Sequence, residues 1–279
     1  MGDTIRSWRL HERLTGQDRS SPKDVLDIHY DTINPARREI VRLGLHLRDT
    51  QREVFSDEAL KALAALEKWL EAGASSDLQS ENAELATRLN TFFRFVVTPL
   101  ALKHGGGESG LARFLKDASA RIRNDPKARF GEEECRFIDK VLSEAWSTRS
   151  VAGRNDRGAR TQATRGSAQN PPLGWFDSLD GFGSLDPAQD LAPAKITCRD
   201  GQTIHCQAAQ SYTQWVPLHD IDAAQTVCPV GHSDRPDSRY RASTMALWGQ
   251  AKLHPAPISR EAVEKIATER IQLWPRGSL

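Results

Sequence analysis

The feature that most constrains the fold is a helical spacing of apolar residues, repeated in separate blocks through the first half of the chain. The clearest block places Leu60, Leu63, Leu66 and Leu70 on one stripe after Ser56. A spacing of three or four residues puts such side chains on one face of a helix, and Ser56 is a favoured N-cap residue. Because each such helix must bury its apolar face, the first half is expected to form a packed helical region.

Pro and Gly mark the ends of most of the expected helices. Ser21-Pro22 opens the first helix, which runs to about Ile33, and Pro35 restarts the chain for the second. Gly73 stands where a C-cap glycine belongs after the leucine block. The remaining helices are expected from about Asn82 to Pro99, around Leu111 to Ile122 after three glycines, and around Phe137 to Trp146.

The pattern changes after residue 150. Residues 151–172 are rich in Gly, Arg, Ser, Thr and Gln and nearly free of apolar residues, which predicts a polar linker. Beyond it, short β-branched and aromatic runs predict strands, and two helical pieces follow. The expected fold class is α+β, with a helical region over 1–150, the linker, and a β-rich region with terminal helices over 173–279. The strands are expected at Gln202–Ala208, Ser211–Leu218 and Thr226–Val230, and the helices around Tyr240–Leu253 and after Ser259.

Charge and hydropathy limit the partners. The 38 basic and 37 acidic residues give a net charge of +1, which argues against a nucleic-acid binder. The arginines at 154, 157, 160 and 165 could serve an unrelated binding module, but a solvated linker is favoured. No apolar run approaches the ~18 residues of a membrane span. Met1–Leu14 lacks the apolar core of a signal peptide, so the chain is expected in the cytoplasm if expressed as shown, unless the gene starts further upstream.

Residue chemistry alone reveals no active site. Gly107-Glu108-Ser109-Gly110 approaches a serine-hydrolase elbow but lacks its second glycine spacing, and so favours a helix start. Gly231-His232-Ser233 lacks the following glycine as well. Four histidines lie on the expected helices without an evident nucleophile beside them, which favours surface or structural roles. They are His11, His29, His46 and His104.

The cysteines are ambiguous. Cys198, Cys206 and Cys228 lie near three histidines, but zinc sites prefer Cys-x(2–4)-Cys pairs, which are missing. Buried or strand-facing cysteines are therefore favoured, and no metal site is predicted. A Cys198–Cys206 disulfide across a turn stays open, because it depends on the redox compartment. The histidines concerned are His205, His219 and His232.

Several segments, taken in order, resemble one known family. Gln210–Val216, Cys228–Tyr240 and Trp248 are similar to the closing segment of the penicillin acylases, which has a strand, a Pro-Gly turn, a Ser-x-x-Tyr pair and a later aromatic residue. The tail from Leu253 resembles the family's C-terminus. In the first half, the similar segments are Arg6–Leu10, Ser21–Val25, Asn34–Arg38 and Leu85–Phe93.

The resemblance also has departures. Arg239 stands where the family usually has histidine, and His232 stands where glutamine is common. Residues 151–172 do not match the family at that place, and a disturbed or degraded gene copy would produce such a stretch.

The resemblance implies an N-terminal-nucleophile (Ntn) hydrolase with an αββα core. In this family a precursor cleaves itself into α and β chains, and the new N-terminal serine attacks an amide carbonyl with its own α-amino group as base. Backbone N–H groups and an asparagine stabilise the oxyanion. The implied substrates are small N-acyl amides, including β-lactam side chains and acyl-homoserine lactones, and the implied compartment is the periplasm.

The resemblance places this chain in the C-terminal part of the β subunit. The nucleophilic serine and the oxyanion asparagine are then expected upstream, so no catalytic residue is expected within the chain. Arg9, with Arg6 as the alternative, matches an arginine that lines the family's active site and is the candidate substrate-binding residue; a surface role is the competing interpretation. No cofactor is expected, and the family's calcium site is expected outside the chain. The expected partners are an upstream β segment and an α chain, with neither nucleic acid nor membrane, and the alternative is a catalytically inert remnant or association fragment.

Overall fold

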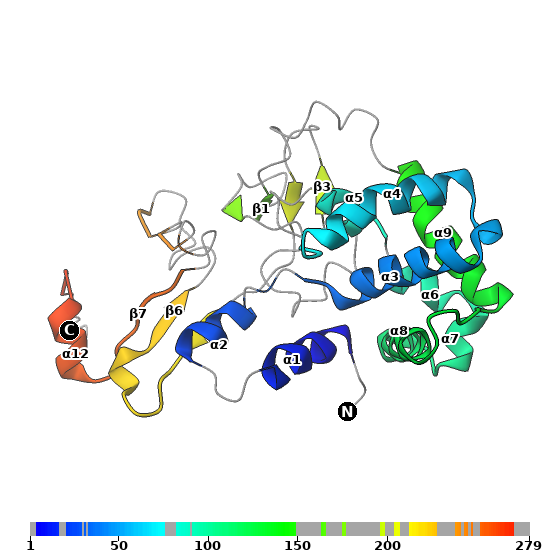
Figure 1. Cartoon of the computed structure of the whole chain (residues 1–279). Coiled ribbons are helices and arrows are strands. Elements are labelled where there is room, and N and C mark those ends of the chain that lie inside the picture. The colour runs from blue at the N-terminus through cyan, green and yellow to red at the C-terminus, as the bar shows by residue number, and fades with distance from the viewer. Residues whose placement is uncertain are drawn as a thin grey trace, which may run out of the picture.

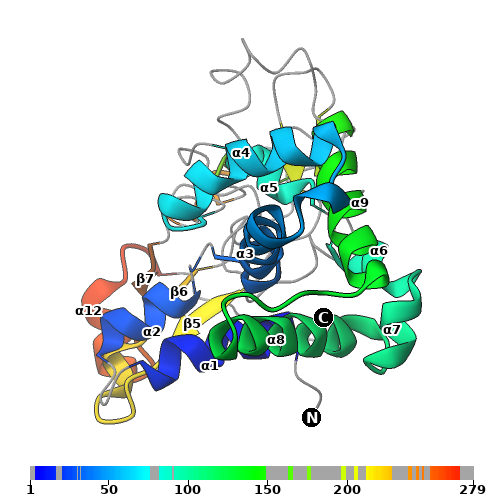
Figure 2. The same ribbon diagram turned by 45° about the vertical axis from the view of Figure 1, so that its right-hand side comes forward.

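Helix α3 (Pro35–Thr50) lies at the centre of the helical part of the computed structural model, with α4, α8 and α9 around it (Figures 1 and 2). Figure 2 views α3 along its axis and shows these neighbours on different sides of it. The structure describes residues 4–16, 21–29, 31, 33–75, 82–89, 91–148, 163–165, 175–176, 196–198, 204–206, 212–227, 238–240, 243–244, 247 and 252–270.

The described helices fall mainly in the first half of the chain. The outer helices of this part are α1 (Ile5–Thr15), α2 (Pro22–His29), α4 (Asp57–Glu71), α5 (Ala83–Thr87), α6 (Thr91–Val96), α7 (Pro99–Lys103), α8 (Gly107–Asn124) and α9 (Glu132–Thr148), and a 3-10 turn, η1, covers Arg52–Val54. Near the C-terminus lie a second 3-10 turn, η4 (Ile221–Ala223), and helix α12 (Arg260–Ile266).

Local capping explains why several helices begin where the sequence predicts. The Ser56 side chain accepts a hydrogen bond from the backbone N–H of Ala59 at the start of α4. Asn34 caps α3 in the same way, with Pro35 at its first turn. At the far end of α4, Gly73 has a φ of 101°, a left-handed conformation that glycine adopts without strain. The expected helices at α3, α4, α8 and α9 are therefore confirmed.

Two helix predictions need correction. The first expected helix ends at His29 rather than Ile33. The single helix expected from Asn82 to Pro99 is two helices, α5 and α6, with a turn between them. The Arg94 guanidinium donates to the backbone carbonyl of Leu89 at 2.9 Å. It thus provides a partner for a carbonyl that the interrupted helix cannot satisfy. Helix α7 was not predicted as a separate element.

The core of the helical part is apolar and aromatic. Phe95, Phe114 and Phe137 bring α6, α8 and α9 together, with ring centroids 5.7–5.8 Å apart. On α3, Gly44 lets two neighbouring helices approach closely. A Cβ atom at Gly44 would lie 2.7 Å from Leu63 Cδ2 on α4 and 3.2 Å from Leu142 Cδ1 on α9. The absence of a side chain at this position is therefore part of the packing.

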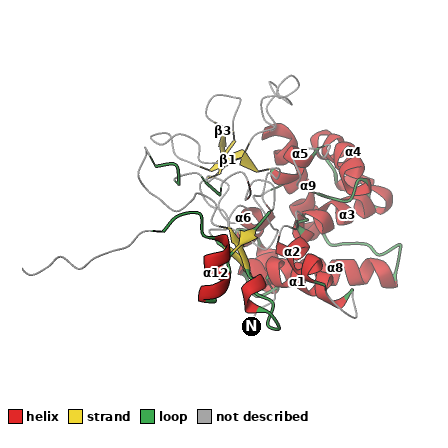
Figure 3. Cartoon of the chain, turned by 90° about the vertical axis from the view of Figure 1, so that its left-hand side faces the viewer, coloured by secondary structure: helices red, strands yellow, loops and turns green. Residues whose placement is uncertain are grey.

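The strands lie to one side of helices α3, α4, α8 and α9 and form two small sheets (Figure 3). One sheet has the order β2-β1-β4-β3, in which β1 and β4 are parallel and the other pairs are antiparallel. The other has the order β5-β6-β7 and is antiparallel. The strands are β1 (Ala163–Arg165), β2 (Trp175–Phe176), β3 (Ile196–Cys198), β4 (Ile204–Cys206), β5 (Thr213–Trp215), β6 (Gln225–Val227) and β7 (His254–Pro255).

The structure is helix-rich with small sheets, which agrees with the expected α+β class. Two of the expected strands contain β4 and β5, and the third, Thr226–Val230, overlaps β6, which begins one residue earlier at Gln225. Of the expected linker, only β1 is described, and it is a strand; the rest of 151–172 lies outside the described residues, as does most of the helix expected at Tyr240–Leu253. None of the helices in the described ranges is long and apolar enough to cross a membrane.

We predict that Gly44→Ala lowers the free energy of unfolding by about 1–2 kcal/mol, because overpacking two neighbours outweighs the better helix propensity of alanine. Urea denaturation followed by circular dichroism measures the change. Gly16→Ala is the matched control, since Gly16 has a φ of −78° and a Cβ there would lie 3.4 Å from the nearest atom, the Glu12 carbonyl oxygen. Equal stability of Gly44→Ala and the parent protein would contradict the close-approach interpretation.

Candidate functional site

Arg9 lies in the middle of α1, a helix that starts with a reciprocal cap. The Thr4 hydroxyl accepts from the backbone N–H of Ser7, and the Ser7 hydroxyl accepts from the backbone N–H of Thr4. Ile5 and Trp8 then bury α1 against the core. This geometry directs Arg9 toward the interior, where only 7% of the residue is exposed.

The Arg9 guanidinium is held by two carboxylates. Its Nε donates to Asp31 Oδ1 at 3.0 Å and its Nη2 donates to Asp31 Oδ2 at 2.7 Å, which is a bidentate pair. Its Nη1 donates to Glu12 Oε2 at 2.9 Å. All three guanidinium nitrogens of Arg9 therefore bind carboxylate oxygen.

The ion pairs continue from α1 onto α3. Arg38 donates to both carboxylate oxygens of Glu12, at 2.6 and 3.1 Å, and its Nε donates to Glu39 at 2.9 Å. Glu39 also accepts from Arg42 at 2.6 Å and from the Ser119 hydroxyl at 2.8 Å. We call the series Asp31–Arg9–Glu12–Arg38–Glu39 the ion-pair chain. It joins α1, the segment between α2 and α3, α3 itself and, through Ser119, α8.

Burial and charge shift the pKa values of Glu12 and Arg38, in the ion-pair chain, in opposite directions. Partial burial tends to raise the pKa of Glu12, but hydrogen bonds from Arg38 and Arg9 outweigh it, so that the pKa of Glu12 lies below its ordinary value. Burial tends to lower the pKa of Arg38, and its bonds with Glu12 and Glu39 outweigh that, so that the pKa is raised. Both shifts favour the charged forms.

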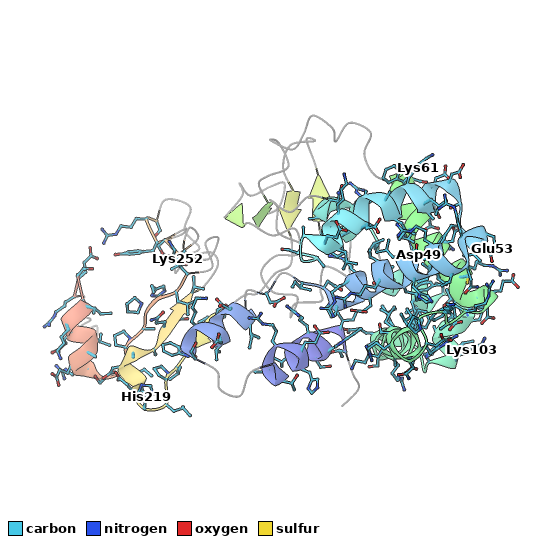
Figure 4. The ribbon with its side chains drawn as sticks, viewed as in Figure 1. Asp49, Glu53, Lys61, Lys103, His219 and Lys252 are labelled. Atoms are coloured by element: carbon cyan, nitrogen blue, oxygen red, sulfur yellow. The ribbon has the colours of Figure 1, made fainter. Side chains whose placement is uncertain are left out.

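Most other charged side chains in the described regions are at the surface. Figure 4 shows Glu53, Lys61 and Lys103 at the outside of the helical part, and all three are exposed. The ion-pair chain differs because Arg9, Asp31 and Glu39 are buried. It is therefore the most distinctive charged feature of the described structure, and Arg9 is its central cation. The predicted contact between Arg9 and substrate stays a prediction; Arg6, the alternative, has a side chain outside the described residues.

The other sequence candidates are placed in structural roles or are not described. Ser109 lies in the first turn of α8, so the expected helix start is confirmed there. His46 Nε2 lies 2.7 Å from the carbonyl oxygen of Ala128, and His104 Nδ1 lies 3.8 Å from Asp117 Oδ2. Neither contact involves a hydroxyl or thiol nucleophile. His11 is exposed on α1. The side chain of His29 and all of His232 and Cys228 lie outside the described residues.

The strand register shows how Cys198 and Cys206 are placed relative to each other. In the β3–β4 pair, Cys198 stands opposite Ile204 and Cys206 stands opposite Ile196. The two cysteines are therefore not directly opposed across the ladder. Among the residues that the structure describes, no three His, Cys, Asp or Glu side chains gather in a way that could hold a metal ion.

Sequence reasoning missed a depression between η1 and α9 with a volume of about 420 Å³. Gln51 stabilises its wall: its side chain donates to the carbonyl of Phe130 at 3.0 Å and accepts from the N–H of Phe130 at 2.6 Å. Burial and the nearby Glu134 charge raise the pKa of the Cys135 thiol, which makes it a poor nucleophile at neutral pH. The residues lining the depression are Gln51, Val54, Phe130, Glu132, Cys135, Arg136 and Asp139.

Asp222 is a second residue that the sequence did not single out. It accepts from the backbone N–H groups of Ile258 and Ser259, at 3.0 and 2.7 Å, and from the Ser259 hydroxyl at 2.6 Å. These hydrogen bonds, chiefly those from Ser259, lower the pKa of Asp222. Ser259 in turn caps α12 as expected. Arg239, the departure noted at a turn position, contacts Tyr240 and Glu269.

A comparison with protein families matches residues 1–265 to the penicillin amidases, a class of amide hydrolases. Because the match spans nearly all of the sequence, the chain belongs to the penicillin amidase family. The family resemblance predicted from the sequence is thus confirmed. A comparison with curated proteins finds no match to the chain.

We predict that Asp31→Asn lowers the free energy of unfolding by about 3 kcal/mol, because it leaves the Arg9 charge buried without its bidentate partner. Asp27→Asn is the matched control: Asp27 pairs with Lys23 on the exposed face of α2, where an ion pair contributes little. Denaturation of both variants at neutral pH measures the difference. Equal stabilities of the two variants would show that the ion-pair chain does not support the fold.

We predict that Gln51→Ala lowers the free energy of unfolding by about 2–3 kcal/mol, because it removes the acceptor of the Phe130 N–H and leaves the Phe130 carbonyl only the weak Cys135 thiol as donor. Gln214→Ala, on the exposed side of β5, is the control. Thermal unfolding of both variants measures the effect. A Gln51→Ala protein as stable as the control would mean that water replaces the side chain without loss.

Proposed function

We propose that this chain is the C-terminal part of the β subunit of a hydrolase that cleaves linear amide bonds. The single observation that carries this proposal is the family match over residues 1–265. The helix-rich structure with its small sheets supports placing the chain in an Ntn-hydrolase αββα fold. The proposed domains are a helical region over 1–150, a connecting stretch over 151–172 and a β-rich region over 173–279.

The proposed chemistry is attack of an N-terminal serine on the acyl carbonyl of an N-acyl amide. The α-amino group of that serine takes up the hydroxyl proton and later transfers a proton to the leaving amine. Water then cleaves the acyl-enzyme ester and releases the carboxylic acid. The serine and the oxyanion asparagine belong to a proposed upstream segment, and an α chain completes the substrate pocket. Candidate substrates are β-lactam side-chain amides and acyl-homoserine lactones; the proposed compartment is the periplasm, and the proposed calcium site lies outside this chain.

Arg9 is the residue of this chain that we propose to face the substrate. Asp31 and Glu12 hold three of its N–H groups, and a guanidinium has five. The two remaining N–H groups can donate to a carbonyl or carboxylate oxygen of the substrate. Because the carboxylates already fix the plane of the guanidinium, little conformational entropy is lost when it binds substrate.

We predict that the purified chain alone does not hydrolyse a phenylacetyl or long-chain acyl anilide, whereas the chain co-expressed with its upstream genomic sequence does. Release of the coloured aniline measures the rate. The matched control is Ser109→Ala, which removes the serine of the elbow-like segment and leaves the rate unchanged. Hydrolysis by the chain alone would place the nucleophile within it, and absence of hydrolysis from both preparations would support the inert remnant.

A further inference from the structure

The two halves of α1 are attached to the rest of the protein by different forces. Ile5 and Trp8 in the N-terminal half are 1% and 8% exposed and belong to the apolar core. The N–H of Ile5 donates to Glu108 on α8 at 2.7 Å. The Lys116 ammonium, also on α8, lies 5.3 Å from the centre of the Trp8 ring. This half therefore has an apolar anchor.

The C-terminal half, Arg9 to Thr15, adds no side chain to that apolar core. Its Leu14 is 47% exposed. Its charged contacts with the rest of the protein are those of Arg9 and Arg13 with Asp31 and of Glu12 with Arg38. Burial of apolar area is insensitive to carboxylate protonation, whereas an ion pair is lost when its acid is neutralised.

We propose that the C-terminal half of α1 is an acid-released latch, which opens separately from the helical part while Ile5 and Trp8 stay anchored. In the closed state the ion-pair chain fastens this half to α3. In the open state the Arg9 guanidinium is released from Asp31 and Glu12. The latch is a property of the folded chain and does not depend on the proposed function.

The charges around Glu12 explain why acid releases the latch. Neutralising Glu12 removes the acceptor shared by Arg9 and Arg38 and leaves these two cations near each other in a partly buried place. Arginine outnumbers carboxylate in the cluster, so each neutralised acid increases the repulsion. The groups that face it are Arg9 and Arg13 from α1, Asp31 from the segment between α2 and α3, and Arg38, Glu39 and Arg42 from α3. On α8, Ser119 binds Glu39, while Glu108 and Lys116 meet the other end of α1.

The direction of the pH effect follows from the pKa of Glu12. Because the folded pKa lies below the ordinary one, Glu12 contributes its full stabilisation above about pH 4.3, the ordinary pKa of Glu. The contribution is lost as the pH falls through the folded value. The latch is therefore closed at neutral pH and opens as the pH falls through the folded pKa of Glu12, which lies below the ordinary value.

Hydrogen–deuterium exchange of the full chain tests the latch. Exchange rates, corrected for the intrinsic effect of pH, are compared at pH ~7 and pH ~4 and below. Peptides covering Arg9–Thr15 are expected to lose about tenfold more protection on acidification than peptides of α3, α8 and α9. At neutral pH, Glu12→Gln is expected to show part of this loss, since the amide mimics the protonated acid.

Two controls separate the latch from general destabilisation. Glu71→Gln changes an exposed acid at the end of α4 and is expected to exchange like the parent protein at every pH. Arg38→Lys keeps the charge but loses the bidentate bond to Glu12, and is expected to raise the pH of release. If Glu12→Gln does not fold, the pH series on the parent protein and on Arg38→Lys tests whether Arg9–Thr15 opens separately from the other helices. Equal loss of protection in α1 and α9, or unchanged protection of Arg9–Thr15, would overturn the proposal.

Discussion

The burial of α3 on several sides at once is the constraint on which the rest of the helical part depends. A helix in this position cannot present one apolar stripe and leave the opposite face to solvent. On the side of α4 and α9 it lacks a side chain at Gly44, which lets the backbones approach. Toward α1 it presents Arg38 and Glu39, whose charges are satisfied by the ion-pair chain. One face of α3 is therefore buried by close backbone packing at Gly44, and the other by ion pairs of Arg38 and Glu39.

The parts of this fold that could be predicted from sequence are those set by local rules. The N-caps at Asn34, Ser56 and Ser259 and the left-handed turn at Gly73 were predictable because each depends on a few neighbouring residues. The break between α5 and α6 was not, because the apolar spacing continues through it. The carbonyl groups there are satisfied by Arg94, which also reaches Val141 on α9. Such a long-range partner leaves no local pattern.

The candidate site likewise combines features that local sequence predicts with contacts between residues far apart in the chain. Arg9 was singled out by a family resemblance, and its environment could not be predicted, because Asp31 is 22 residues away and Arg38 is further. Glu12 alone had a local relation to Arg9, at the i, i+3 spacing that places two side chains on one helix face. The family itself was predictable, since the order of several weak segments identifies it even where no single residue does.

The contact between Gln51 and Phe130 has a consequence for how this sequence can vary. By donating to one backbone group of Phe130 and accepting from the other, the side chain does what a neighbouring β-strand would do. The segment that enters α9 is thereby held at Phe130 and, two residues earlier, by His46 at the carbonyl of Ala128. Residues 124–127, which are exposed, are then free to lengthen or shorten without displacing the helix that follows. The length of the loop at residues 124–127 can therefore change in evolution while the packing of α9 in the core stays the same.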